Sequence, residues 1–127
     1  MNITHFSRSR LYATFKECEV DGDFADPMAN YLVYGYEPGS CFTAVLANDF
    51  VGAVRCSHPS NTITAFKALA GWIHSYMPPT AYGSYDKVRA WLELDSDERR
   101  AILERNRLIY SAKEETWMAL RGEEELV

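Results

Sequence analysis

The chain has 127 residues, of which 47% are hydrophobic and 24% charged, and this composition excludes a disordered or fibrous protein. Its length fits one ordinary domain, so we predict a single domain over residues 1–127. The formal net charge of -5 disfavours a nucleic-acid surface, and binding through Arg8, Arg10 and Lys16 is the function that we expect least. We find no apolar run typical of a membrane span or signal peptide, and therefore expect a cytoplasmic protein.

Local signals predict two helices near the start of the chain. An apolar side and a basic side at helical spacing indicate a helix over residues 7–18. The pair Asp26 and Pro27 is typical of a helix start, because the carboxylate can accept backbone N–H groups and proline fits the first helical position. Gly35 suits the left-handed residue that ends a helix, so the second helix is predicted over residues 26–34.

Two longer helices are predicted in the middle of the chain. Ser40 is the expected N-cap of one, which would continue past residue 50. Ser60 or Asn61 would cap the other, which we expect to be central in the fold and to stop at Pro78. The apolar face of the first helix would carry an acid and consist of Phe42, Val45, Leu46, Asp49 and Ala53. The stripe of the second helix would be Ile63, Phe66, Ala70, Ile73 and Met77.

The C-terminal third predicts a short helix and a long one. The short helix would begin at Gly83-Ser84, and the long one at Asp95, where Glu98 completes the spacing of a capping box. The long helix is predicted to reach Leu120, with Leu103, Tyr110 and Trp117 repeating every seven residues. These signals together predict an all-α fold, a compact single-domain bundle of five or six helices with a long C-terminal helix.

Metal and redox chemistry find little support in the sequence. Cys56 and His58 could supply two ligands, but we see no spacing typical of a metal site, so no metal or cofactor is expected. Other candidate ligands are Cys41, His5 and His74. The odd number of cysteines without paired spacing favours free thiols in a reducing compartment.

Two groups of polar and aromatic residues are the candidate binding residues. Asn48 and Asp49 would lie on the apolar face of a helix, where a carboxylate needs partners. Asp49 would therefore either hold or cap a neighbouring segment, or form a polar site between helices. Tyr34, Tyr36 and Glu37 gather at the end of another helix, and exposed tyrosines are enriched where proteins bind one another.

Two blocks, GYEPGSCFTAVLANDF and YGSYDKVRAWL, resemble a family of small uncharacterised proteins that often occur in bacteriophages, prophages and other mobile elements. The resemblance covers residues 31–94 as a family-like core and leaves residues 95–127 as a C-terminal helical extension. Cys41 and Phe42 depart from the Phe-Leu of the family pattern. The matching residues are Gly35, Pro38, Gly39, Ala44, Val45, Leu46, Asn48, Asp49, Gly83, Ser84, Lys87, Val88, Trp91 and Leu92. The resemblance implies a phage or mobile-element origin and transfers no activity.

Three functions follow as expectations. The leading one is a non-enzymatic protein-binding module that docks on a host or defence protein, for example an inhibitor of CRISPR interference. An alternative is a self-assembling structural or chaperone-like phage component, a homo-oligomer joined through Leu103, Tyr110 and Trp117. Another alternative is a small enzyme with a polar site at Asp49, although we recognise no catalytic motif around it.

Overall fold

The computed structural model describes residues 3–56 and 62–126, with the side chains of residues 119 and 121–126 left out. This described part forms eight helices and no strand, so the predicted all-α class is confirmed, whereas the predicted number of five or six helices is too low. The helices are α1 (His5–Glu17), α2 (Gly22–Tyr34), α3 (Ser40–Leu46), α4 (Phe50–Cys56), α5 (Ile63–Tyr76), α6 (Tyr85–Glu93), α7 (Ser96–Arg105) and α8 (Ala112–Leu126).

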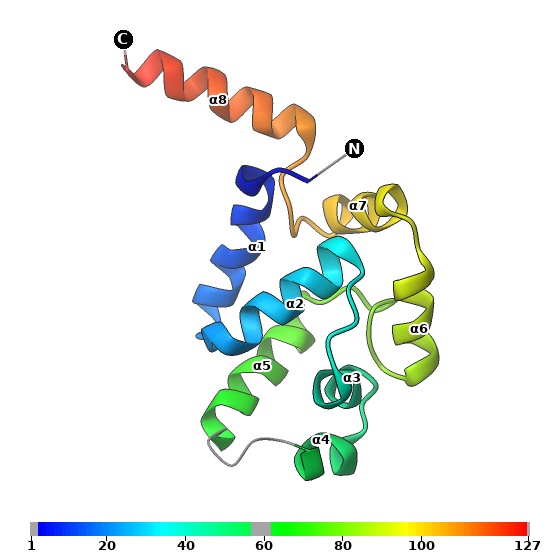
Figure 1. Ribbon diagram of the computed structural model, residues 1–127. Helices are drawn as coiled ribbons and strands as arrows, with labels where there is room; N and C mark the ends of the chain where they lie inside the picture. The colour runs from blue at the N-terminus through cyan, green and yellow to red at the C-terminus, as the bar shows by residue number, and fades with distance from the viewer. Residues whose placement is uncertain (1–2, 57–61, 127) are drawn as a thin grey trace.

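Helix α2 runs through the middle of the molecule, with α1 and α5 on one side and α6 and α7 on the other (Figure 1). Its buried residues Met28, Tyr31 and Leu32 join side chains from these neighbours in one core. Trp72 of α5 and Trp91 of α6 are fully buried there. Burial of these aromatic rings supplies much of the apolar area that stabilises the fold.

The polar atoms of the buried aromatic residues all have partners. The Trp72 indole N–H donates to the Thr14 hydroxyl at 2.9 Å, and the Trp91 indole N–H donates to the Tyr31 carbonyl at 3.1 Å. The Tyr31 hydroxyl donates to the carbonyl of Ala81 at 2.8 Å. An unpaired polar group would be costly in this core, so these bonds fix how α1, α2, α5 and α6 face one another.

Helix α2 begins earlier than predicted. Asp21, not Asp26, is the N-cap, and its carboxylate accepts the backbone N–H of Asp23. Pro27 therefore lies inside the helix. The predicted end is confirmed, because Gly35 adopts the left-handed conformation with φ 67°.

The single helix predicted from Ser40 past residue 50 is wrong, because the chain breaks between Leu46 and Phe50. Asn48 takes a left-handed conformation with φ 63°, and the Asp49 N–H then donates to the carbonyl of Ala44 at 2.8 Å. This pattern closes α3 and turns the chain into α4. Asp49 is consequently not on the face that Phe42, Val45 and Leu46 form.

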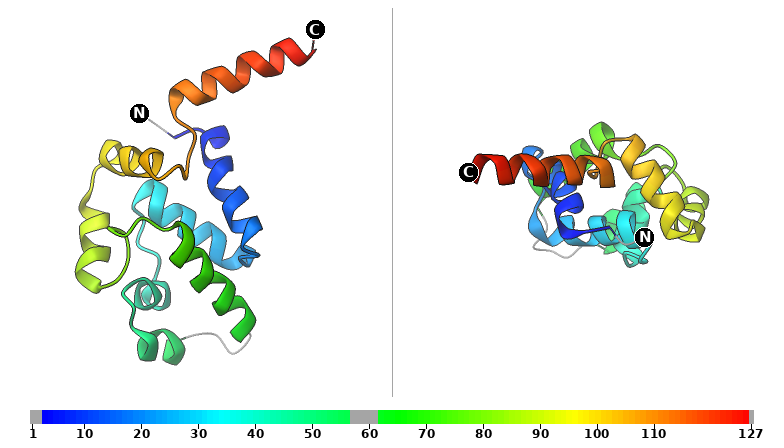
Figure 2. Two further views of the ribbon diagram at one scale, coloured as in Figure 1. Left: turned by 180° about the vertical axis from the view of Figure 1, so that it is seen from behind. Right: turned by 90° about the horizontal axis from the view of Figure 1, so that it is seen from above.

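The long C-terminal helix is also wrong. The chain leaves the helix after Arg105, passes through a left-handed Arg107 with φ 58°, and starts α8 at Ala112. The predicted capping box of Asp95 and Glu98 is confirmed at the start of α7. Figure 2 shows α8 standing off the body at the end opposite α4.

Helix α2, and not α5 as predicted, lies in the middle of the molecule, and the predicted stripe of α5 is buried in the core only at Ile73 and Met77. The core receives Leu69, Trp72 and Ile73, whereas Ile63 is 87% exposed. Thr62 is the N-cap, with its hydroxyl accepting the Ala65 N–H; the predicted caps Ser60 and Asn61 lie outside the described residues. The apolar arc of α5 is therefore wider than the core needs.

Candidate functional site: an apolar groove beside α4 and α5

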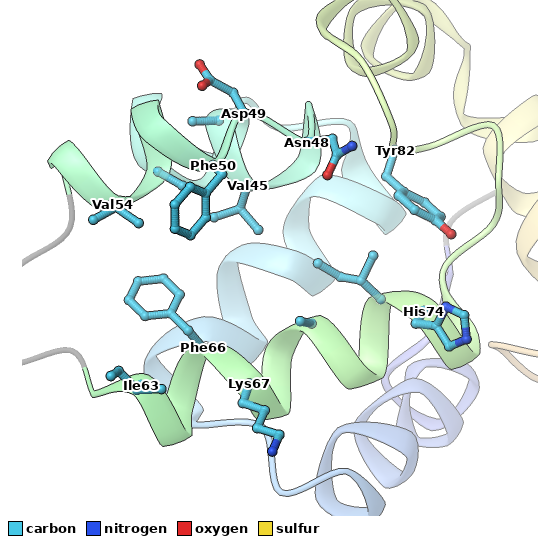
Figure 3. Close-up of a pocket in the computed structure, with 14 residues that line it drawn as sticks. Val45, Asn48, Asp49, Phe50, Val54, Ile63, Phe66, Lys67, His74 and Tyr82 are labelled. Carbon is cyan, nitrogen blue, oxygen red and sulfur yellow. The ribbon is translucent and has the colours of Figure 1, made fainter.

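A groove of about 790 Å³ opens between the α3–α4 pair and α5. Its volume falls within the range of about 300–1,000 Å³ that is usual for binding pockets. Figure 3 shows Phe50 and Val54 of α4 facing Phe66 and Ile63 of α5 across it. Further lining residues are Ala44, Val45, Asn48, Asp49, Ala53, Lys67, Ala70, Ile73, His74 and Tyr82.

The apolar walls of this groove are exposed to solvent. Phe50 is 78% exposed, Val54 is 56% exposed, and Ile63 is the most exposed large apolar residue of the described chain. Several large apolar side chains gathered on one surface are typical of an interaction site. Phe50 was not among the residues that we expected from the sequence, and the signal for it was the apolar spacing of Phe50 and Val54 at i and i+4.

The helices that flank the groove carry basic residues and no acid, and Asp49 lies in the turn between α3 and α4. The sequences of α3, α4 and α5 contain Arg55, Lys67 and His74 but no aspartate or glutamate. In Figure 3 the Lys67 side chain and the Asp49 carboxylate extend away from the gap, which leaves the interior of the groove apolar. The groove therefore presents an apolar floor with cationic helices on its sides.

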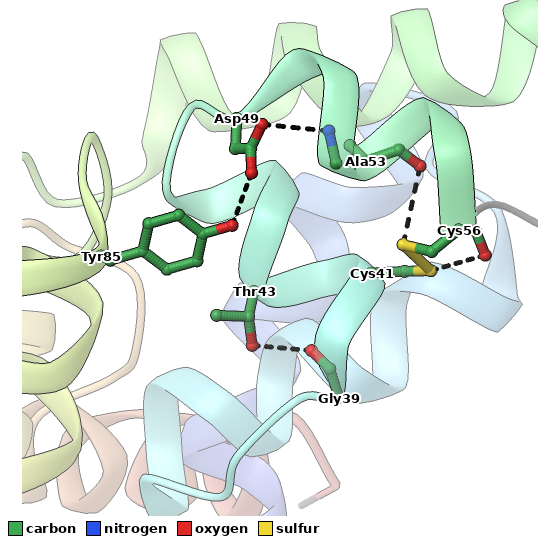
Figure 4. Close-up of a disulfide and its surroundings, with 8 residues drawn as sticks. Gly39, Cys41, Thr43, Asp49, Ala53, Cys56 and Tyr85 are labelled. Atoms are coloured by element: carbon green, nitrogen blue, oxygen red, sulfur yellow. Dashed lines mark hydrogen bonds between the residues drawn. A yellow bond between two sulfur atoms is a disulfide. The ribbon is translucent and has the colours of Figure 1, made fainter.

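Both carboxylate oxygens of Asp49 accept hydrogen bonds (Figure 4). One oxygen accepts the Gly52 backbone N–H at 3.0 Å and caps α4, while the other accepts the Tyr85 hydroxyl at 2.6 Å. The hydrogen bond from Tyr85 and then that from Gly52 lower the pKa of Asp49, and Asp49 raises the pKa of Tyr85. Asp49 thus links α4 to the start of α6.

Asp49 leaves little room for a side chain at Gly52. A Cβ atom at position 52 would lie 2.5 Å from a carboxylate oxygen of Asp49. The neighbouring Asn48 is exposed, and Figure 3 shows its side chain at the Tyr82 end of the groove. The structure therefore places Asn48 and Asp49 at the groove, where the carboxylate positions the α4 wall.

The prediction of free thiols is wrong for two of the three cysteines. Cys41 of α3 and Cys56 of α4 form a disulfide with their Cα atoms 5.6 Å apart (Figure 4), and Cys18 is free. The turn between α3 and α4 brings the two cysteines together, which sequence spacing alone does not reveal. This disulfide fixes α4 to α3 and so holds one wall of the groove.

The tyrosine candidates lie outside the groove lining. The rings of Tyr34 and Tyr36 stack with their centroids 5.3 Å apart, and the guanidinium of Arg8 lies 5.6 Å from the Tyr34 centroid. Glu37 is exposed beside them. The structure therefore separates the predicted binding residues into two places, with Tyr34, Tyr36 and Glu37 at the end of α2.

The residues Leu103, Tyr110 and Trp117 do not share one helix. Leu103 is buried in the core, and Tyr110 lies in the connection between α7 and α8, where its ring stacks on Phe6 at 5.2 Å. Trp117 of α8 is 62% exposed. Among these three residues, Trp117 alone offers a large exposed apolar surface.

Among the described residues, no group of three or more histidine, cysteine or acidic side chains could hold a metal ion. The candidate ligand His58 lies outside the described residues. None of the helices in residues 3–56 and 62–126 is long and apolar enough to cross a bilayer. No family model, curated protein or solved structure matches the chain.

Proposed function

We propose that this protein is a non-enzymatic binding module that accepts an amphipathic helix of another protein in the groove beside α4 and α5. The observation that carries the proposal is the pair of apolar walls, with the exposed Phe50 and Val54 on one side and the exposed Ile63 beside the partly buried Phe66 on the other. Two helices that flank an apolar gap are the geometry in which proteins commonly receive the apolar face of a third helix.

The chemistry of the walls defines the partner helix. The groove helices carry Arg55 and Lys67 without an acid, so the polar side of the incoming helix should be acidic. Its apolar side should present large anchors at i and i+3 or i+4 to fill the gap. In keeping with the resemblance to phage and mobile-element proteins, the target would be a host or defence protein inside the infected cell, for example a component of CRISPR interference.

A capture experiment tests this function with two acidic substitutions at the groove. Phe50→Glu and Ile63→Glu change exposed residues at the first positions of α4 and α5, where an acid suits the helix dipole, so the double variant should fold. Tagged wild-type protein should retain one dominant partner from host lysate, and the double variant should lose it. Retention of the same partner by the variant would contradict the groove as its site.

The matched control is Val51→Glu. Val51 is 71% exposed on the same helix as Phe50 but does not line the groove. This variant adds the same charge beside the groove and should keep the partner. A loss of the partner in both variants would indicate a general charge effect.

Self-assembly is the second candidate function, favoured by α8. This helix exposes Trp117, Met118 and Leu120. The enzyme alternative receives the least support, because both oxygens of Asp49 already have hydrogen-bond donors within the fold.

A further inference from the structure

Helix α8 is fixed at its base, and the large apolar side chains described beyond its first turn are exposed. Ser111 caps the helix, Glu114 pairs with Arg10 of α1 at 3.2 Å, and Glu115 accepts the Thr4 hydroxyl at 2.8 Å. After this first turn, Trp117 and Leu120 are more than half exposed. They are three positions apart in the helix, so they lie on neighbouring positions of one helical face.

The α8 of a chain cannot reach the groove of the same chain while its base is attached to α1. In Figures 1 and 2, α8 leaves the body beside α1, and α4 lies at the other end of the molecule. An occupant of the groove that resembles α8 must therefore come from a second chain.

The charges of α8 are opposite to those of the groove helices. Its sequence holds five glutamates against one lysine and one arginine, whereas α3, α4 and α5 hold Arg55 and Lys67 and no acid. Complementary charge favours encounter and orients a docked helix. Helix α8 thus has both the apolar anchors and the acidic character that the groove requires.

We infer that the groove of one chain binds α8 of a second copy. Trp117 and Leu120 would then lie between the α4 wall, which contains Phe50, and the α5 wall, which contains Ile63. The inference rests on the proposed helix-binding function and names its partner as the protein itself. If the exchange is reciprocal, two copies form a closed dimer; if it is one-way, each copy offers a free groove and a free helix, and longer assemblies form.

Sedimentation velocity of full-length variants tests this contact. The wild-type chain should self-associate in a concentration-dependent manner. Trp117→Ala with Leu120→Ala removes the anchors, and Phe50→Glu with Ile63→Glu places acids opposite an acidic helix. Each double variant should weaken self-association at least about tenfold, as is usual when anchor residues are lost. Val51→Glu should associate like the wild type.

Mixing the two double variants gives the decisive result. The groove variant keeps an intact α8, and the α8 variant keeps an intact groove. An equimolar mixture should therefore regain a 1:1 complex, although neither variant associates alone. A contact between two α8 helices, or between two grooves, would be lost in one variant only and would not be restored by mixing, and either pattern would overturn the inference.

The outcomes separate this inference from the proposed function. A wild-type chain that stays monomeric at its highest soluble concentration would overturn self-docking. The proposed function would still stand if Phe50→Glu with Ile63→Glu abolished capture of a different protein. If that variant kept the captured protein but lost self-association, the self-docking inference would stand and the heterologous target would not bind the groove.

Discussion

At the scale of single residues, Arg99 and Gly35 form a close contact between α7 and the end of α2. Arg99 is a buried arginine whose guanidinium donates to the carbonyl of Tyr34 at 3.1 Å and to that of Leu94. These bonds satisfy the end of α2 and join it to the turn before α7. A Cβ atom at position 35 would lie 2.6 Å from a guanidinium nitrogen of Arg99, so this contact needs glycine.

Gly35→Ala should lower the free energy of unfolding by about 1–2 kcal/mol, the usual cost of a left-handed non-glycine residue, with a further loss from displaced Arg99. Urea denaturation would measure this. Gly71→Ala is the matched control, because a Cβ at this helical position in α5 meets nothing within 4 Å. It should raise stability by about 0.5–1 kcal/mol. Equal effects of the two substitutions would contradict this account.

The lowered pKa of Asp49 predicts that the stability of the fold depends on pH. Its pKa is lower in the folded chain than its ordinary value of 3.8, so the unfolded chain takes up the proton first as the pH falls. The stabilisation from Asp49 is therefore present at neutral pH and lost on acidification below this value. Wild type should exceed Asp49→Asn in urea midpoint at neutral pH, and the difference should shrink below pH 3.8.

Tyr85→Phe is the control for this prediction, since it removes the same hydrogen bond from the other side. It should lower the urea midpoint at neutral pH and also flatten the dependence on pH. If the difference in urea midpoint between wild type and Asp49→Asn stays constant across the pH range, the charge of Asp49 does not contribute to the pH dependence of stability.

At the scale of helices, those starts and ends that depend on local chemistry could be predicted from the sequence. Ser84 caps α6, the pair Asp95 and Glu98 caps α7, and Gly35 ends α2, as their residue types indicate. The start of α2 was missed because two aspartates five residues apart could each serve as its cap. Asp21 prevails, since the earlier start places Phe24 in the core.

The two helix breaks could not be predicted, because left-handed residues other than glycine make them. Asn48 and Arg107 hold positive φ, and in each case the next N–H donates back to a carbonyl five residues earlier. After α7 the donor is Leu108, which is fully buried together with its acceptor Leu103. Tertiary burial of Leu108 therefore decides a break that the continuous helical pattern of the sequence conceals.

The disulfide should contribute most of the attachment of α4 to α3. Cys41→Ser with Cys56→Ser removes a link across a sequence separation of 15, for which the expected loss is about 3 kcal/mol in the free energy of unfolding. Calorimetry under oxidising conditions would measure it. Cys18→Ser, at the free cysteine, is the control and should change stability little. Equal stability of oxidised and reduced wild-type protein would contradict the prediction.

At the scale of the whole molecule, the candidate site was only partly predictable. The sequence indicated Asn48 and Asp49, and it identified Ile63 and Phe66 as apolar, but it placed both in the core, whereas Ile63 is exposed and Phe66 is only partly buried against the core. The groove exists because α4 turns away from α3 and leaves the second apolar side of α5 uncovered. A periodic pattern tells which residues share a face, and the number of helices available to cover that face is a property of the complete fold.

The three tryptophans occupy two contrasting environments. Trp72 and Trp91 are fully buried in the core, whereas Trp117 on α8 is largely exposed to solvent. Selective loss of the Trp117 signal on adding a soluble quencher would therefore isolate the emission of a single helix in the unlabelled protein. If α8 enters the groove of another chain, this emission should shift to shorter wavelength and resist quenching, so the native chain carries its own optical reporter of docking.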